Sequence, residues 1–168
     1  KTILKISKKM YSSTSLKSML RVASFYRIYI KLFDKKVLLM ADYYTHSVYE
    51  PNFKSEQEKF DYADQLLQYY TQSRFIVTSR LHASLPTIAM GIPTLFVYNE
   101  NIPRSAGRFE GLLEHVNCIQ YQDEKWNGLN GFKLPHIISI DYKFTNKNTH
   151  INLSDLMSDT CYSFVKKD

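Results

Sequence analysis

Two hydrophobic patterns alternate along the chain. Apolar residues at helical spacing predict long amphipathic helices at residues 15–33, 55–72 and 153–164. The same reasoning predicts shorter helices at residues 79–91 and 109–115. Compact apolar runs predict strands at residues 2–6, 37–41, 74–78, 93–98, 118–121 and 137–144. Two glycines and a proline predict irregular structure at residues 126–135.

Strands that alternate with helices at this spacing are typical of βαβ units, which form a parallel sheet. Right-handed crossovers then place helices on both faces of the sheet. We therefore expect an α/β fold with a Rossmann-like parallel sheet. The length of 168 residues predicts a single domain over residues 1–168.

Two local signals refine this picture. Ser55 and Glu58 have the spacing of a capping box at the start of the second long helix. Pro86 lies inside the helix predicted after residue 78, where it removes a hydrogen bond and crowds the carbonyl of His82. Either that helix is kinked at Pro86, or it begins near Pro86 after an irregular turn.

The net charge of +6 favours anionic partners such as phosphorylated small molecules, acidic membrane surfaces or nucleic acid. The charges are scattered, and the chain has neither paired Cys/His zinc spacing nor an aromatic RNA-binding strand motif. We therefore do not expect nucleic acid as a partner.

Cysteine usage indicates a reducing, cytoplasmic setting, because Cys118 and Cys161 are the only cysteines and lie far apart. The sequence has no clustered metal ligands, and we expect neither a metal ion nor a cofactor. No apolar stretch approaches the roughly 18 residues of a membrane-spanning helix. Arg27, Lys31 and Lys35 lie four apart, at and just beyond the end of the helix predicted at residues 15–33, on a face other than its apolar one. That helix either packs on its own domain or touches an anionic membrane at its cytoplasmic face.

Ligands of open α/β sheets bind outside the carboxyl ends of the strands. Three successive predicted strands end there in cationic or titratable residues. The first delivers His46, and the third leads to Arg104 and Arg108. The second delivers the segment from Thr78 to His82. We expect these ends to open on one edge of the sheet.

The junction after residue 78 carries the sharpest signal. A strand that passes directly into a helix leaves the first N–H groups of the helix free for a phosphate or carboxylate. Arg80 adds a guanidinium suited to bidentate contact with such oxygens, beside the hydroxyls of Thr78 and Ser79. His82 adds an imidazole, the side chain that ordinarily exchanges protons near neutral pH. The junction therefore predicts anion binding with acid–base chemistry.

At this junction the sequence resembles a known family. Residues 74–93 read RFIVTSRLHASLPTIAMGIP, and the segments ADQLLQYY at 63–70 and RFEGL at 108–112 accompany them. This pattern resembles that of polysaccharide pyruvyl transferases, over residues 37–120. The resemblance implies one half of a GT-B-like architecture, in which two Rossmann-like domains face each other.

The resemblance also implies a reaction. Family members transfer a pyruvyl group from phosphoenolpyruvate to a hydroxyl pair of a bacterial surface polysaccharide or its lipid-linked precursor, and form a ketal. On this chain His82 would be the catalytic acid or base, and Arg80 and Arg108 would hold the phosphate and carboxylate of the donor. Thr78, Ser79 and His46 would complete the substrate-binding set.

The chain departs from the family in length, because typical members are about twice as long and have an N-terminal partner domain that is absent here. Two other functions stay open. A GT-B-type glycosyltransferase could hold the diphosphate of a nucleotide-sugar at the same helix terminus. A non-catalytic half-domain is the other alternative.

Overall fold

In the computed structural model, the described residues are 1–44, 53–98 and 111–149, together with 151, 155, 158, 159 and 162. They form two compact units. Unit 1 comprises Lys1–Leu66, Tyr121–Asn127 and Lys133–Lys143. Unit 2 comprises Leu67–Gln120, Gly128–Phe132 and Phe144–Asp168. The expectation of a single domain over residues 1–168 stays a prediction.

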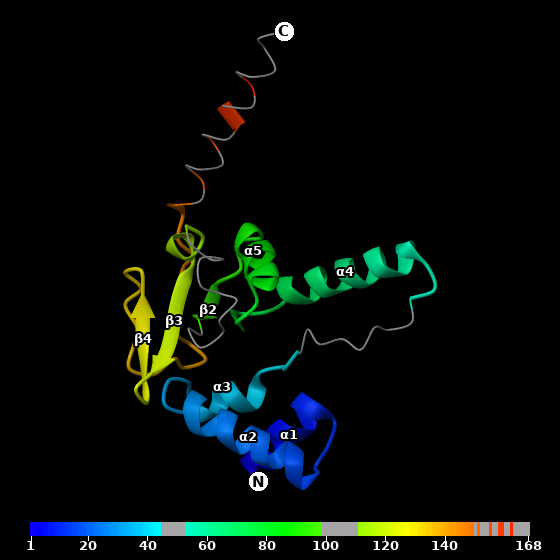
Figure 1. The fold of residues 1–168 in the computed structure, drawn as a ribbon, viewed down its shortest axis with the longest axis vertical. Coiled ribbons are helices and arrows are strands. Elements are labelled where there is room, and N and C mark those ends of the chain that lie inside the picture. The colour runs from blue at the N-terminus through cyan, green and yellow to red at the C-terminus, as the bar shows by residue number, and fades with distance from the viewer. Residues whose placement is uncertain are drawn as a thin grey trace. The chain divides into compact units, whose positions relative to one another are not determined.

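Unit 1 begins with three helices, α1 (Thr2–Tyr11), α2 (Leu16–Tyr29) and α3 (Lys35–Met40), which Figure 1 shows in blue to cyan. Ser15 caps α2 by accepting a hydrogen bond from the backbone N–H of Ser18 at 3.3 Å. The core between α1 and α2 contains Ile6 and Val22, both fully buried. The helix predicted at residues 15–33 is therefore confirmed.

The two strands predicted at the start of unit 1 are wrong. Residues 2–6 belong to α1, where Ile3, Ile6 and Met10 recur at helical spacing and Ile6 is buried. Residues 37–41 fall in α3, which Asp34 caps by accepting from the N–H of Lys36 at 2.7 Å. Apolar runs of about five residues fit either period, so burial of Ile6 in α1 and the Asp34 cap of α3 accompany the helical outcome.

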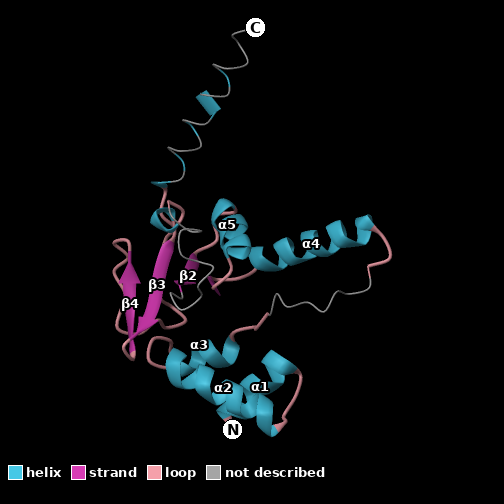
Figure 2. Ribbon diagram, in the orientation of Figure 1, coloured by secondary structure: helices cyan, strands magenta, loops and turns pink. Residues whose placement is uncertain are grey.

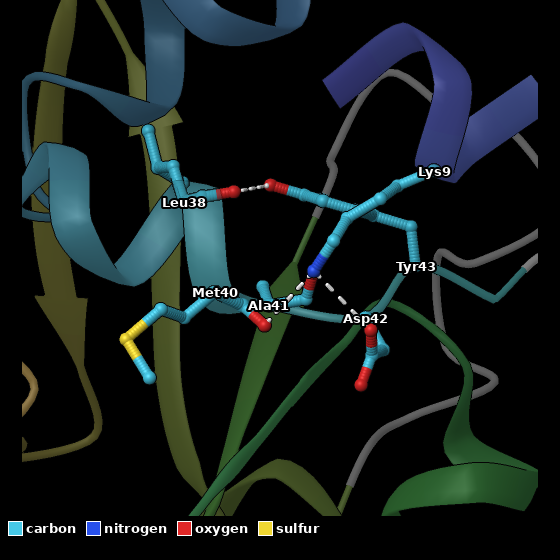
Figure 3. Close-up of polar contacts among 6 residues, drawn as sticks. All are labelled: Lys9, Leu38, Met40, Ala41, Asp42 and Tyr43. Carbon is cyan, nitrogen blue, oxygen red and sulfur yellow. Dashed lines mark hydrogen bonds and ion pairs between the residues drawn. The ribbon is translucent and has the colours of Figure 1, made fainter. Parts of the chain in front are cut away.

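The end of α3 is fixed by Lys9 of α1. The Lys9 ammonium donates to the carbonyl oxygens of Met40 at 3.2 Å and Ala41 at 2.9 Å, and lies 3.4 Å from the Asp42 carboxylate (Figure 3). A cation is favourable there because the last carbonyls of a helix carry partial negative charge. Tyr43 donates from its hydroxyl to the carbonyl oxygen of Leu38 at 2.6 Å. Burial raises the pKa of Tyr43 to about 12.

Later segments of the chain complete unit 1. The indole N–H of Trp126 donates to the carbonyl oxygen of Ile28 at 3.0 Å, and its ring lies 5.2 Å from that of Tyr29 in an edge-on contact. Ile138 forms an isolated parallel bridge with Phe33. The strand predicted at residues 137–144 is wrong, because this single bridge is its only pairing among the described residues.

Among the described residues the sheet contains four strands in the order β1-β2-β3-β4: β1 (Ile76–Thr78), β2 (Thr94–Tyr98), β3 (Asn117–Gln122) and β4 (Lys125–Leu129). Figure 2 labels the last three, which are drawn in magenta. The first three are parallel. Thr78 lies opposite Phe96, which in turn lies opposite Cys118. The predicted α/β class is therefore confirmed, as are the strands at residues 74–78, 93–98 and 118–121.

β4 was not predicted, because residues 126–135 read as irregular. A two-residue turn precedes it, with Asp123 and Glu124 at φ values of 49° and 60°. Two positive φ values define the mirror-image turn that suits hairpins, and this turn is usually signalled by Asn-Gly or Asp-Gly. Asp-Glu gives no such signal.

Three further helices have both ends within the described residues: α4 (Glu56–Thr71), α5 (Leu81–Ala89) and the short 3₁₀ helix η1 (Leu113–His115). The hydroxyl of Ser55 accepts from the N–H of Glu58 at 3.2 Å, as the capping box predicts. The Glu58 carboxylate accepts from the N–H of Lys54 at 2.6 Å, one residue earlier than a regular capping box. α5 packs on β1 and β2. Most of the helix predicted at residues 153–164 lies outside the described residues.

Candidate strand-to-helix anion site

β1 ends at Thr78, and only Ser79 and Arg80 separate it from α5. The N–H of Arg80 donates to the hydroxyl of Thr78 at 3.0 Å, which closes a tight turn. Arg80 has extended backbone angles, and its carbonyl oxygen accepts from the N–H groups of Ala83 at 3.1 Å and Ser84 at 3.0 Å. The predicted direct passage from strand to helix is therefore present.

Two backbone donors stay available at this helix start. Among the described residues, no group accepts a hydrogen bond from the N–H of Leu81 or of His82. First-turn N–H groups have no partner within a helix, so side chains, water or a ligand must satisfy them. Together with the helix dipole they favour an anion.

The side chains around these donors divide into two sets. Ser79, Arg80 and His82 are exposed, whereas Ala83 and Ser84 are buried against the sheet. A guanidinium and an imidazole thus stand in solvent within three residues of each other, at the carboxyl end of β1. This arrangement can hold an anion and exchange a proton with it. The binding and catalytic roles of these residues stay predictions.

Buried hydroxyls hold α5 in place. The hydroxyl of Thr94 on β2 donates to that of Thr87 on α5 at 2.8 Å, and Thr87 donates to the carbonyl oxygens of Ala83 at 3.0 Å and Ser84 at 2.9 Å. The hydroxyl of Ser84 donates to the carbonyl oxygen of Leu81 at 3.0 Å. Ser84, Thr87 and Thr94 are fully buried, and each hydroxyl has a partner. Each of these three hydroxyl donors is therefore satisfied in a place from which water is excluded.

α5 runs through Pro86 and ends at Ala89, two residues before Gly91. Of the two predicted arrangements, the one in which the helix includes Pro86 is correct. The N–H of Gly91 donates to the carbonyl oxygen of Ile88, and that of Ile92 donates to Thr87, both at 2.9 Å. Gly91 has φ of +75°, so these bonds form the Schellman motif that glycine favours.

A residue that sequence reasoning missed supports the turn after α5. The side-chain oxygen of Asn146 accepts from the N–H of Thr94 at 2.9 Å, and its amide nitrogen donates to the carbonyl oxygen of Ile92 at 2.7 Å. Asn117 holds the same segment by donating to the carbonyl oxygen of Thr145 at 2.8 Å. No local pattern indicates Asn146, because its partners lie more than fifty residues earlier.

The other predicted site residues lie elsewhere. His46 lies outside the described residues, and the segment that was expected to deliver it as a strand is α3. β2 ends at Tyr98, and the positions that follow it, including Arg104 and Arg108, also lie outside the described residues. Of the predicted set, the structure therefore brings together only residues 78, 79, 80 and 82.

Three further observations concern the described residues as a whole. Cys118 lies fully buried in β3, where burial raises the pKa of its thiol to about 11. Within the described part of the chain, no group of three His, Cys, Asp or Glu side chains could hold a metal ion. No helix among the described residues is long and apolar enough to cross a membrane.

The described residues thus combine an α/β sheet with an exposed Arg and an exposed His at a strand-to-helix junction. The chain belongs to the polysaccharide pyruvyl transferase family, a family of transferases whose model matches residues 3–101, more than half of the chain. Neither a curated protein nor a solved structure matches it. The match includes the junction and begins well before residue 37, where the resemblance began. It ends before Arg108, so the carry-over to Arg108 rests on the resemblance alone.

Proposed function

We propose that this protein transfers a pyruvyl group from phosphoenolpyruvate to two hydroxyls of a saccharide, forming a cyclic ketal. One observation carries the proposal. The exposed Arg80 and His82 flank two available helix N–H donors, within the residues that match the family. A donor with a phosphate and a carboxylate suits such a site.

The donor would be held by charge and by backbone. The N–H groups of Leu81 and His82 would receive one anionic group of phosphoenolpyruvate, and Arg80 would bind it or its neighbour through two parallel hydrogen bonds. Thr78 and Ser79 contribute hydroxyls at the same end of β1. By resemblance, we assign Arg108 to the second anionic group and His46 to substrate binding.

His82 would supply the proton that starts the reaction. Its imidazolium protonates the terminal CH₂ carbon of the enol, which leaves a positive charge shared by the central carbon and its oxygen. One sugar hydroxyl adds to that carbon and releases its proton to a base. Phosphate then departs with the electrons of its C–O bond, and the second hydroxyl adds to the same carbon and loses its proton. The products are one ketal and one inorganic phosphate.

The same proposal includes the acceptor and the place of reaction. A saccharide linked to lipid would be met at the cytoplasmic face of the membrane, where phosphoenolpyruvate is also available. An N-terminal partner domain would form the opposite wall of the cleft. Both walls matter because catalysis requires the reacting atoms to be held in a defined geometry.

Thermal unfolding with and without phosphoenolpyruvate tests donor binding. A ligand that binds only the folded state raises the unfolding temperature. We expect a rise for the native chain that is lost in Arg80→Ala and His82→Ala. Two control variants make the same chemical change elsewhere. Arg74→Ala lies before β1, at the end opposite the site, and His136→Ala removes an exposed His of unit 1.

The controls should keep the rise. No rise with phosphoenolpyruvate, or a rise that survives in Arg80→Ala and His82→Ala, contradicts donor binding at this junction. A rise with nucleotide-sugars alone would replace the proposal with the glycosyltransferase alternative. Inorganic phosphate release, measured with the partner domain and an acceptor saccharide present, then tests the transfer itself.

A further inference from the structure

The positive charge of this protein is concentrated at its start. Residues 1–33 hold eight Lys and Arg and no Asp or Glu. Residues 34–168 hold fourteen Lys and Arg against sixteen Asp and Glu, a net charge of −2. The whole excess of cations therefore belongs to α1, α2 and the residues beside them.

Most of these cations point into solvent without an acidic partner. The exposed set that forms no ion pair with any described carboxylate comprises Lys1, Lys5, Lys8, Lys17, Arg21 and Arg27. Lys9 differs, because it binds the end of α3. Lys31 also differs, since its ammonium donates to the Tyr121 hydroxyl and the Glu124 carbonyl oxygen, both at 3.0 Å. The free cations are thus Lys1 before α1, two lysines of α1, and three cations spread from the first to the last turn of α2.

Large apolar side chains are exposed among these cations. Leu16 is 70% exposed and Leu20 is 61% exposed, and their spacing of four residues places them on one face of α2. On α1, Leu4 is 41% and Tyr11 is 38% exposed. The opposite faces of both helices are already used, because they pack in the core of unit 1. α1 and α2 lie side by side (Figure 1).

We propose that the α1–α2 basic surface, formed by these exposed cations and apolar side chains, docks on an anionic membrane. The Leu side chains would enter the boundary between headgroups and acyl chains, while Lys and Arg contact anionic headgroups. Each cation held near such a surface strengthens binding about five-fold, and burial of each Leu about ten-fold. Nucleic acid would also attract the cations, but it would give the exposed Leu pair no apolar environment.

This inference deepens the proposed function, since it names the surface that would bring the enzyme to a lipid-linked acceptor. It differs from the sequence-based expectation for residues 15–33. α1, whose residues 2–6 were predicted to be a strand, contributes Lys5 and Lys8 to the free cations, and Lys31 is bound within unit 1. Membrane binding is measured without donor or acceptor, so either proposal can fail while the other stands.

Co-sedimentation of the full chain with vesicles tests the inference. We expect binding to vesicles of equal parts phosphatidylglycerol and phosphatidylcholine, weaker binding at high salt, and none to phosphatidylcholine alone. Lys17→Glu with Arg21→Glu should weaken binding at least a hundred-fold. Leu16→Ser with Leu20→Ser leaves the charge unchanged and should weaken it at least ten-fold. All four side chains are exposed, so circular dichroism should show an unchanged fold.

Matched controls change the same chemistry elsewhere on unit 1. Lys133→Glu with Lys143→Glu gives the same net charge as the Lys17/Arg21 variant, and Met40→Ser removes an apolar side chain that is 56% exposed. Both should bind as the native chain does. The inference is overturned if the native chain does not bind anionic vesicles, or if both charge variants lose binding equally. It is also overturned if duplex RNA binds as tightly and the Leu substitutions change nothing.

Discussion

The hydroxyl of Thr94 lies 2.8 Å from the hydroxyl of Thr87, and both side chains are fully buried. This bond joins β2 to the middle of α5, the helix whose first turn carries His82. The Thr94 hydroxyl also lies 2.8 Å from the carbonyl oxygen of Ile92, and the Thr87 hydroxyl bonds to backbone carbonyls of α5, so the pair couples two backbone segments away from water. The position of the candidate site therefore depends on a contact that never touches a ligand.

A double-mutant cycle should reveal this coupling. Thr87→Val and Thr94→Val preserve shape, and each should lower the free energy of unfolding by about 1–2 kcal/mol. The double variant should lose about 1 kcal/mol less than the sum of the two single variants, because both single substitutions remove the same Thr87–Thr94 hydrogen bond. Urea unfolding measures all four values. Strict additivity would show that the two hydroxyls do not stabilise each other.

Asn146 should be needed for the turn between α5 and β2. Asn146→Ala removes both a donor and an acceptor from backbone groups and should cost about 2 kcal/mol of unfolding free energy. Asn146→Asp keeps the acceptor but sets a carboxylate against the carbonyl oxygen of Ile92, so it should not restore stability. Asn148→Ala, at an exposed position two residues away, should change stability by less than about 0.5 kcal/mol. Chemical denaturation of the three variants provides the comparison.

The cost of substituting Gly91 should depend on how readily the new residue adopts the left-handed backbone conformation. Its φ is +75°, and no atom lies within 4 Å of an added Cβ, so the cost comes from the backbone alone. Gly91→Ala should lower the unfolding free energy by about 1 kcal/mol, and Gly91→Asn by less, because Asn adopts this conformation more readily. Thermal melts rank the variants. An equal loss for both would point to a steric cause instead.

Cys118 should make stability depend on alkaline pH. Burial raises its pKa from 9.0 to about 11, so the folded state keeps the neutral thiol after the unfolded state has lost its proton. The stabilisation is complete below pH 9 and falls as the pH rises from 9 to 11. The stability difference between the native chain and Cys118→Ala should shrink over this window and stay constant below pH 8. Urea unfolding at matched pH, where all other groups cancel, measures it.

The parts of the fold that the sequence predicts well are those with local signals. Ser55 and Glu58 cap α4 within four residues, and Gly91 ends α5 where its φ is needed. Where the signal is a short apolar run, as at residues 2–6 and 37–41, the two-residue repeat of a strand cannot be distinguished from the 3.6-residue repeat of a helix. Packing and capping then decide, and Asp34 makes the second of these segments a helix.

The candidate site shows the same division. Residues 78–82 are contiguous, so the junction, its two backbone donors and its exposed Arg and His follow from a strand signal and a helix signal alone. Asn146 is separated by 52 residues from the N–H that it binds, and such a pairing exists only after the chain has folded. The sequence could therefore indicate the candidate residues at positions 78–82, but not the distant side chain of Asn146 that supports the turn after α5.

Pro86 shows how the local structure of α5 depends on contacts with distant parts of the chain. It cannot donate to the carbonyl of His82, and an isolated nine-residue segment with a central proline would not hold a helix in water. The first turn of α5 is thus ordered by β1, β2 and the buried hydroxyls rather than by its own propensity. A peptide containing residues 74–93 should accordingly show no preference for phosphate. In hydrogen exchange, the amides of α5 should open together with those of β2, in a single cooperative event.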